Sequence, residues 1–299
     1  MRLRPSLSYL ERYDNASSAA SREIISSYST SFSLATKLLA PRVRRDIAHL
    51  YAMVRIADEI VDGTAGEAQL STADVSAELD AYEQRVLLAP RQRFHTDPVL
   101  HAYGQSARRC GFKEEYIRAF FASMRRDLHQ TTYDALDFAA YVYGSAEVIG
   151  LLCLQAFIVD IPITTQEREL MEEGARALGA AFQKINFLRD LSEDSHALGR
   201  RYFPQLAERE LNDATKKELI DDIRHDLRLA RTVIPHLPYS SRMGVIAATD
   251  FFAELTRLLD QTPTSDIYSR RVSVSSITKT KIFVRAIQRA FTTTSKDRI

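Results

Sequence analysis

Residues 51–62 read YAMVRIADEIVD and combine an apolar helical pattern with ionisable side chains. The ionisable positions, at steps of four, three and four residues, are Tyr51, Arg55, Asp58 and Asp62. Side chains three or four residues apart share one face of an α-helix. Because positions 47, 50, 54 and 61 are apolar, the two aspartates lie beside or within the face that should be buried. Burying a carboxylate is costly unless a cation compensates it.

A second stretch, FQKINFLRDLSED at residues 182–194, repeats this arrangement. Its polar positions, at steps of three, four and four residues, are Gln183, Asn186, Asp190 and Asp194, and Arg189 lies beside them. Two predicted helices therefore each offer an Asp-x-x-x-Asp pair with an arginine nearby.

Paired aspartates at this spacing have a direct chemical use. Two aspartates one helical turn apart place their carboxylates about 6 Å apart. Mg²⁺ prefers oxygen ligands and usually joins protein carboxylates to substrate phosphates. Two facing pairs would hold a diphosphate between them, with Arg55 and Arg189 contacting its oxygens. Acidic pairs at this spacing are also common on solvated helix faces, so spacing alone leaves both interpretations open.

Helical periodicity extends over most of the chain. Apolar residues recur at steps of three and four, and no alternating stretch of useful length predicts a strand. The predicted helices cover about 24–39, 47–61, 98–110, 113–128, 134–159, 164–194, 213–234, 240–260 and 278–291, with loops at 63–75 and 195–205. The chain has no internal repeat and no linker rich in Gly, Ser or Pro, so we expect one all-α domain over residues 1–299.

Local capping signals define two of these helices. Asp97-Pro98 predicts a helix start, with Gly111 as the stop. Thr164 with Glu167 has the spacing of a capping box and opens the long helix that is predicted to run toward Asp194.

Composition excludes several classes of protein. With 40 Lys+Arg and 39 Asp+Glu, the net charge of +1 excludes a broad basic footprint, so we expect no nucleic-acid partner. The two cysteines cannot form a disulfide framework and suit a reducing compartment. The N-terminal residues are too polar for a signal peptide, so we expect a cytoplasmic protein.

Contact with a membrane surface stays open. The longest apolar run, residues 148–159, is shorter than the roughly 20 residues that span a bilayer and predicts a core helix. The basic C-terminal helix carries an apolar stripe, which either packs on the domain or touches a membrane: Ile282, Phe283, Ala286, Ile287 and Phe291.

Several segments together resemble the squalene/phytoene synthase family, in particular its bacterial phytoene synthases. The most specific are LGAAFQKINFLRDLSED at 178–194 and GRRYFP at 199–204. The others, in the expected order, are YSTSFSLATKLL (28–39), LYAMVRIADEIVD (50–62), YVYGSAEVIGLL (141–152) and SRRVSVSSITKTKIFVRA (269–286). The likeness covers about residues 22–290, which we take as the core of the domain.

This resemblance implies an isoprenoid-synthase helical bundle around a central cavity. Such enzymes join two identical prenyl diphosphates head to head through a cyclopropylcarbinyl diphosphate, with Mg²⁺ (or Mn²⁺) stabilising the departing diphosphate. A phytoene synthase would use two geranylgeranyl diphosphates in carotenoid biosynthesis and would need no NADPH.

The resemblance also assigns roles to individual residues. Asp58, Asp62, Asp190 and Asp194 match the family's catalytic metal-binding aspartates, and Asn186 matches a further metal position. The matches to substrate-binding positions are Tyr28, Ser31, Phe32, Tyr51, Arg55, Gln183, Arg189, Arg200 and Tyr202. Tyr28 stands where some relatives have His, so its contact is expected to differ.

Small residues in the helix at 138–159 allow two interpretations. Gly144, Ser145, Ala146 and Gly150 either leave room for a prenyl chain or let helices pack closely, and the sequence does not separate them.

Three rival functions follow from the same sequence. A C30 synthase would use two farnesyl diphosphates and make squalene or dehydrosqualene, since chain length depends on cavity depth. A non-catalytic helical assembly factor would be expected to lose the acidic ligands, and this chain retains all four. A head-to-tail chain elongator usually carries a DDxxD pattern, which is missing here. The oligomeric state and the general base are not predicted.

Overall fold

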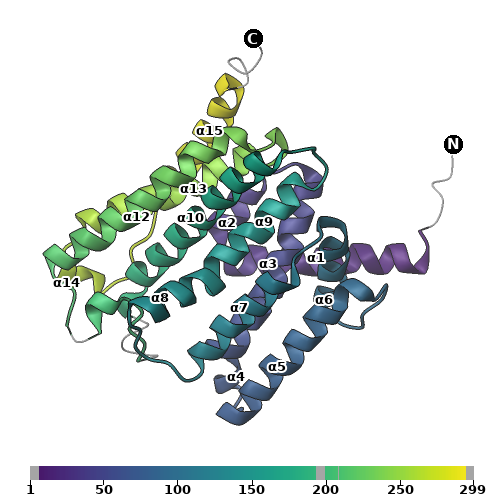
Figure 1. Cartoon of the computed structure of the whole chain (residues 1–299), viewed down its shortest axis with the longest axis horizontal. Coiled ribbons are helices and arrows are strands. Elements are labelled where there is room, and N and C mark those ends of the chain that lie inside the picture. The colour runs from purple at the N-terminus through teal and green to yellow at the C-terminus, as the bar shows by residue number, and fades with distance from the viewer. Residues whose placement is uncertain (1–6, 193–198, 208, 294–299) are drawn as a thin grey trace.

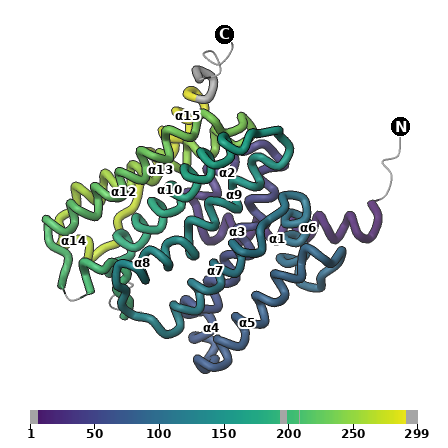
Figure 2. The backbone as a smooth tube through the Cα atoms, viewed as in Figure 1, coloured from purple at the N-terminus to yellow at the C-terminus, as the bar shows by residue number. Residues whose placement is uncertain are grey.

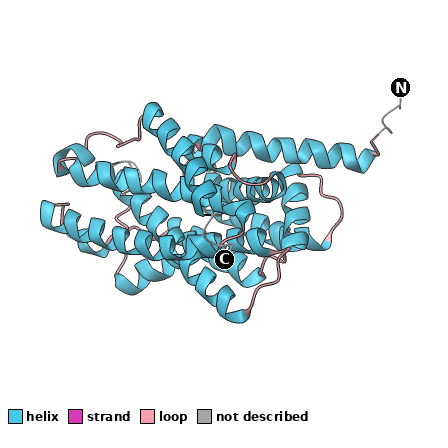
Figure 3. Cartoon of the chain, turned by 90° about the horizontal axis from the view of Figure 1, so that it is seen from above, coloured by secondary structure: helices cyan, strands magenta, loops and turns pink. Residues whose placement is uncertain are grey.

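The computed structural model describes residues 7–192, 199–207 and 209–293. These residues form helices joined by loops, with no strand among them and one isolated bridge, between Thr132 and Arg201 (Figure 3). The all-α prediction is confirmed.

The helices follow one another closely along the chain. The α-helices are α1 (Tyr9–Tyr28), α2 (Thr30–Thr36), α3 (Pro41–Val61), α4 (Thr64–Glu67), α5 (Thr72–Leu88), α6 (Pro98–Cys110), α7 (Glu114–Asp127), α8 (Ala135–Val142), α9 (Val148–Ile158), α10 (Thr165–Arg189), α12 (Asp213–Val233), α13 (Tyr239–Gln261), α14 (Thr264–Ile267) and α15 (Ser276–Thr293). Shorter turns are η1 (Ala89–Arg91), η2 (Tyr143–Glu147), η3 (Pro204–Leu206) and η4 (Ile234–His236).

Two layers of helices face each other (Figure 1). One layer runs from α12 through α10, the continuous α8–η2–α9 rod and α7 to α5, each packed on the next. The other contains α15, α13, α2, α1, α3 and α6, in which α13 packs on α15 and α2, and α1 packs on α2, α3 and α6. Contacts of α12 with α13, and of α3 with α7, join the two layers at either side.

The first helix begins earlier than the apolar pattern predicts. Ser8 and Glu11 form a capping box: the Glu11 N–H donates to Ser8 Oγ at 3.2 Å, and the Ser8 N–H donates to Glu11 Oε2 at 2.7 Å. Such a box satisfies free backbone donors at a helix start. The N-terminal turns of α1 consequently project beyond the rest of the molecule (Figure 2).

The predicted single helix at 24–39 is wrong, because the chain breaks at Ser29. Ser29 has extended backbone angles (φ −143°, ψ 100°) and ends α1. Its Oγ accepts a hydrogen bond from the Phe32 N–H at 3.2 Å and so starts α2. Pro41 then occupies the first position of α3.

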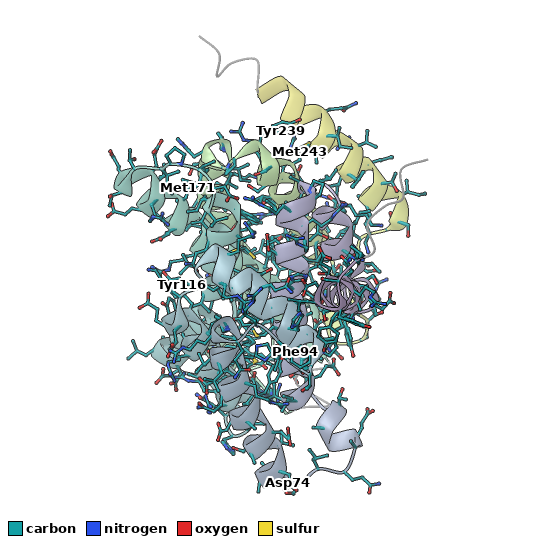
Figure 4. All side chains as sticks on the ribbon, turned by 90° about the vertical axis from the view of Figure 1, so that its right-hand side faces the viewer. Asp74, Phe94, Tyr116, Met171, Tyr239 and Met243 are labelled. Atoms are coloured by element: carbon teal, nitrogen blue, oxygen red, sulfur yellow. The ribbon has the colours of Figure 1, made fainter. Side chains whose placement is uncertain are left out.

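A helix at 72–88 was not predicted. In α5 the buried positions recur at helical spacing, at Val75, Leu79, Tyr82 and Val86. Ser71 caps the helix in a capping box with Asp74. Part of the predicted loop at 63–75 is therefore helical. Figure 4 shows Asp74 at the end of the molecule opposite Tyr239 and Met243 of α13.

The two predicted capping signals are confirmed. Asp97 Oδ1 accepts hydrogen bonds from the N–H groups of Val99 (2.8 Å) and Leu100 (3.2 Å), and α6 ends at Gly111, whose φ of 66° suits glycine. Thr164 Oγ1 accepts from the Glu167 N–H at 3.2 Å and begins α10.

The apolar rod Ala135–Ile158 is the one helix of the described residues that is long and apolar enough to cross a membrane. Its most apolar window is 56% buried inside the protein, between α7 and α10. We therefore assign it to the core, as predicted. The turn η2 has π-helical geometry. The sequence of this rod is apolar on all sides of the helix, and such a pattern does not predict where a π-helical turn lies.

The apolar stripe of α15 packs on the protein. Ile282 and Ala286 are buried against Ala35, Ala247 and Phe251 of α2 and α13. The packing interpretation therefore holds for these two positions, whereas the side chain of Phe291 lies outside the described part of the structure.

Glycines allow the rod to approach its neighbours closely. A Cβ atom at Gly144 would lie 2.4 Å from the carbonyl oxygen of Ala119, and one at Gly150 would lie 2.3 Å from that of Ala175. The close-packing interpretation is therefore correct for these two glycines. Ser145, Ala146 and Gly150 also line the cavity described below.

Gly179→Ala tests this close packing. The new Cβ would lie 2.4 Å from the carbonyl oxygen of Ala146, a backbone atom that cannot move aside without shifting η2. We expect the free energy of unfolding to fall by about 1–3 kcal/mol, as in other overpacked cores. Urea unfolding of the variant measures the change, and an unchanged midpoint would contradict the tight crossing of α10 and η2.

Candidate functional site

A cavity of about 940 Å³ lies between the two helical layers. It follows one face of α10 from Met171 to Asp190, about 28 Å at a helical rise of 1.5 Å per residue. All predicted site residues of the described chain line it: Tyr28, Ser31, Phe32, Tyr51, Arg55, Asp58, Asp62, Gln183, Asn186, Arg189, Asp190, Arg200 and Tyr202. The remaining one, Asp194, lies outside the described residues.

The cavity has a charged part and an apolar part. Its acidic lining comes from the C-terminal ends of α3, α7 and α10. The lining residues of α9, of the first half of α10, of α12 and of η4 are apolar or glycine: Ile149, Gly150, Cys153, Leu154, Phe157, Met171, Gly174, Ala175, Leu178, Ala230, Val233 and Ile234. This division suits a molecule with an anionic head and a hydrocarbon tail.

Asp58 of α3 is an uncompensated acid. Its side chain makes no hydrogen bond or ion pair with any described residue, although Arg55 lies close enough to act through its charge. Burial raises the pKa of Asp58 well above its ordinary value, and the negative charge of Asp62 raises it further. A bound cation would stabilise the ionised form of this carboxyl.

Asp62 and Asp190 occupy matching positions at helix ends. Asp62 ends α3 and donates its N–H to the Asp58 carbonyl at 2.8 Å; Asp190 ends α10 and donates its N–H to the Asn186 carbonyl at 2.8 Å. The carboxyl end of a helix carries the negative end of its dipole, which disfavours an anion and favours a cation there.

The prediction that the long helix runs to Asp194 is wrong at its C-terminal end, because α10 stops at Arg189. Asp190 has φ −99° and ψ 12°, outside the helical range, and its carboxylate is held by the adjacent Arg189 and by Arg271 from a distant segment. A tertiary contact thus accompanies the break in a pattern that is locally helical.

Arg55 lies between an acid and two aromatic rings. Its guanidinium pairs with Glu59 and lies 4.3 Å from the centre of the Tyr28 ring, so Tyr28 makes a cation–π contact. The neighbouring Tyr51 ring stacks on Phe32 at 5.6 Å. Arg55 Nε is buried without a hydrogen-bond partner in the described chain, which leaves a donor for an anionic ligand.

Arg200 fixes the end of α3 from the segment after residue 199. Its Nη1 lies 3.1 Å from Asp62 Oδ1, and its Nη2 donates to the carbonyl oxygens of Val61 (3.3 Å) and Asp127 (2.9 Å). The side chain is only 8% exposed, so this arginine is part of the cavity wall.

Asp127 joins this network although the sequence did not point to it. Tyr141 OH donates to Asp127 Oδ2 at 2.7 Å, and Tyr202 OH donates to Oδ1 at 3.2 Å. Burial raises the pKa of Asp127 to about 6, against the opposing effect of Arg200. The Tyr202 ring also stacks on Phe187 at 4.0 Å, and both side chains line the cavity.

These residues fit a divalent cation that is shared with a substrate. Within residues 7–192, 199–207 and 209–293, no three His, Cys, Asp or Glu side chains are close enough to form a metal site by themselves. Mg²⁺ does not require one, because it is usually held by one or two carboxylates and substrate phosphates and keeps several waters. The uncompensated Asp58 and the helix-end Asp62 and Asp190 supply such carboxylates.

Comparison with known proteins decides the family. The squalene/phytoene synthase profile matches residues 25–278, a span that contains both acidic helices. The chain belongs to the squalene/phytoene synthase family. Membership of this family makes it a prenyltransferase-type enzyme.

Individual squalene/phytoene synthase family members resemble the whole chain. It is 27% identical over 286 residues to the 15-cis-phytoene synthase of Enterobacter agglomerans, covering 88% of this chain and 92% of that protein. It is 28% identical over 313 aligned positions to chloroplastic phytoene synthase 1 of Arabidopsis thaliana, covering 98% of this chain and 70% of that protein. A crystal structure of a dehydrosqualene synthase has the same fold, with a TM-score of 0.78 at 20% identity over 95% of this chain and 99% of that one.

Asp127 and Arg271 line the cavity of this family member, although the sequence did not single them out as site residues. Asp127 ends α7 next to Arg125 and Arg126, a charged sequence that is common at helix ends. No regular sequence spacing predicts its contact with Arg200. Arg271 lies within the SRRVSVSS segment that carries part of the family likeness, but the likeness did not show which acid it contacts. Lys184, which flanks the acidic face in sequence, pairs with Asp222 (2.6 Å) and Asp226 (2.8 Å) of α12.

Proposed function

We propose that the enzyme condenses two geranylgeranyl diphosphates head to head to phytoene, in carotenoid biosynthesis, with release of both diphosphates. The observation that carries the proposal is the single cavity that continues from the acidic ends of α3 and α10 into an apolar passage along α10. The names of the similar phytoene synthases support the C20 substrate.

The chain's own residues have distinct tasks in this reaction. Asp58, Asp62, Asn186 and Asp190 would hold Mg²⁺, which when bound neutralises charge on the departing diphosphate. Arg55, through its unpartnered Nε, and Arg189, which also pairs with Asp190, line the cavity and would orient phosphate oxygens.

Loss of the first diphosphate leaves an allylic cation, which the double bond of the second substrate attacks, and a proton is lost to give the cyclopropylcarbinyl diphosphate. Its own diphosphate then leaves, and rearrangement and loss of a second proton give phytoene.

The walls of the cavity suit a cationic intermediate. The apolar lining of α9, α10 and α12 keeps water away from a carbon cation that water would otherwise capture. The aromatic side chains of Phe32, Tyr51, Phe187 and Tyr202 line the same space and would stabilise passing positive charge. Contact of the exposed surface with a membrane, which would give access to an apolar substrate, remains part of the proposal.

Product analysis tests this function. The purified protein is incubated with Mg²⁺ and either the C15 or the C20 diphosphate, with and without NADPH, and the hydrocarbon is identified by mass. We expect a C40 hydrocarbon with a central conjugated triene from the C20 substrate without NADPH, and no product when Mg²⁺ is removed by a chelator. A C30 hydrocarbon formed from the C15 substrate alone would replace the proposed substrate, and no product from either would favour the assembly-factor alternative.

A further inference from the structure

Arg271 contacts a candidate metal ligand from outside the acidic helix. Its Nε lies 2.8 Å from Asp190 Oδ1, and its Nη2 lies 3.4 Å from Oδ2. Asp190 is 19% exposed, whereas the side chain of Arg271 is 63% exposed. Arg271 makes no other hydrogen bond or ion pair within the described chain. Because exposed ion pairs add little stability, Arg271 can leave Asp190 at a small cost.

The contrast with the other helix-end acid is informative. Arg200, which contacts Asp62, is 8% exposed and also donates to the Tyr202 hydroxyl and to two backbone carbonyls. Removing Arg200 from Asp62 would leave a buried guanidinium with fewer partners, and burying a poorly paired charge costs free energy. Asp190 is also paired with the adjacent Arg189, whose Nε donates to Asp190 Oδ1 at 2.8 Å and whose side chain is 21% exposed. Of the arginines that contact the two acids, Arg271 is therefore the most exposed and the most readily displaced.

The backbone around Arg271 is held independently of its side chain. Tyr268 lies three residues before Arg271, and both its backbone and its side chain are held. Its carbonyl accepts a hydrogen bond from Ser192 Oγ at 2.6 Å, and its hydroxyl accepts one from the Leu211 N–H at 2.9 Å. Val272 and Val274 follow it and pack against the buried cluster beside α10 and α12. Loss of the Arg271 guanidinium should thus leave the segment in place.

We propose that Arg271 is an internal counter-ion of Asp190, which a divalent cation must displace to bind there. This inference rests on the proposed metal-dependent function and deepens it. The sign of the effect follows from charge, since a cation that binds Asp190 takes the place of Arg271 and lies beside its positive charge, whereas the Arg189–Asp190 pair is common to the wild type and a variant without Arg271. Removing the guanidinium therefore tightens cation binding in the absence of substrate.

Mn²⁺ binding to the full chain, measured without any prenyl diphosphate by the electron paramagnetic resonance signal of the free ion, tests the proposal. We expect Arg271→Ala to bind Mn²⁺ about two- to fivefold more tightly than the wild type at low ionic strength. The matched control is Arg270→Ala, because Arg270 is 69% exposed and pairs with Asp266 at 3.0 Å. This control should bind Mn²⁺ like the wild type, and circular dichroism should show equal helix content in all three proteins.

Two results overturn the counter-ion role alone. These are wild-type or weaker Mn²⁺ affinity in Arg271→Ala, and equal tightening in Arg270→Ala, which would show a general charge effect. If neither the wild type nor Arg271→Ala binds Mn²⁺ at millimolar concentration, the metal site itself is wrong, and the counter-ion role falls with it.

Discussion

Asp58→Asn lowers kcat by at least about a hundredfold, the scale seen when one preorganised electrostatic contact to a transition state is removed. The amide keeps the shape of the side chain but loses the charge that a cation needs. Asp58 lines the cavity and has no ionic partner in the described chain, so its charge is available to a bound cation and the substitution removes it from the site. Hydrocarbon formation from the C20 diphosphate at saturating Mg²⁺ measures the effect.

The same substitution should not weaken the fold. Burial and Asp62 raise the pKa of Asp58, so its ionised form is disfavoured in the metal-free protein. A neutral asparagine removes that disadvantage, and the free energy of unfolding without metal should stay equal or rise. Asp74→Asn, which changes an exposed acid of α5 outside the cavity lining, is the control for activity. Full activity of Asp58→Asn would contradict the metal assignment.

His49, which is not one of the predicted metal ligands, makes the stability of the fold sensitive to acid. It is 1% exposed and connects three helices: Nδ1 lies 2.8 Å from Ser106 Oγ of α6, and Nε2 lies 2.9 Å from Ser18 Oγ of α1. Ser106 donates its proton to Asp46 at 2.6 Å, so its oxygen accepts from Nδ1–H of a neutral imidazole. Burial, assisted by the charge of Arg45, lowers the pKa of His49 to about 4.

The sign of the pH effect follows from this lowered pKa. In the unfolded chain His49 takes up a proton below about pH 6.5, whereas in the folded protein it stays neutral until about pH 4. Stability is therefore lost as pH falls through this window. We expect His49 to contribute a loss of about 2 kcal/mol between pH 7 and pH 5, and about 3 kcal/mol by pH 4.

Urea unfolding at pH 7 and pH 5 measures the His49 effect. His49→Gln cannot take up the proton and retains polar atoms, so its stability should change less between the two pH values. The difference between the two proteins isolates His49 from the carboxyl groups that titrate in the same range. Parallel losses in both proteins would show that His49 is not responsible.

Much of the fold could be predicted because its signals are local. The caps at Asp97 and Thr164 depend on residues two or three positions away, and the structure confirms both. The missed helix α5 carried the same kind of signal, with Ser71 and Asp74 in a capping box before apolar positions at steps of four, three and four. The sequence therefore contains enough local information to predict α5.

The remaining features depend on contacts between distant segments. Arg200 meets Asp127 across 73 residues, and Arg271 meets Asp190 across 81 residues. No periodicity connects such positions, because loops of variable length separate them. The break in α10 at Asp190 belongs to the same class, since the sequence on both sides of it is compatible with a continuing helix.

The placement of Asp62 and Asp190 at the last turn of their helices has a consequence for length variation in this family. A residue inserted within α3 before Asp62, or within α10 before Asp190, would rotate that aspartate by about 100° around the helix axis. Its side-chain carboxylate would then point out of the cavity. The same insertion in the loop downstream would leave the carboxylate where it is. Gains and losses of residues should therefore be tolerated after these two acids and rejected before them.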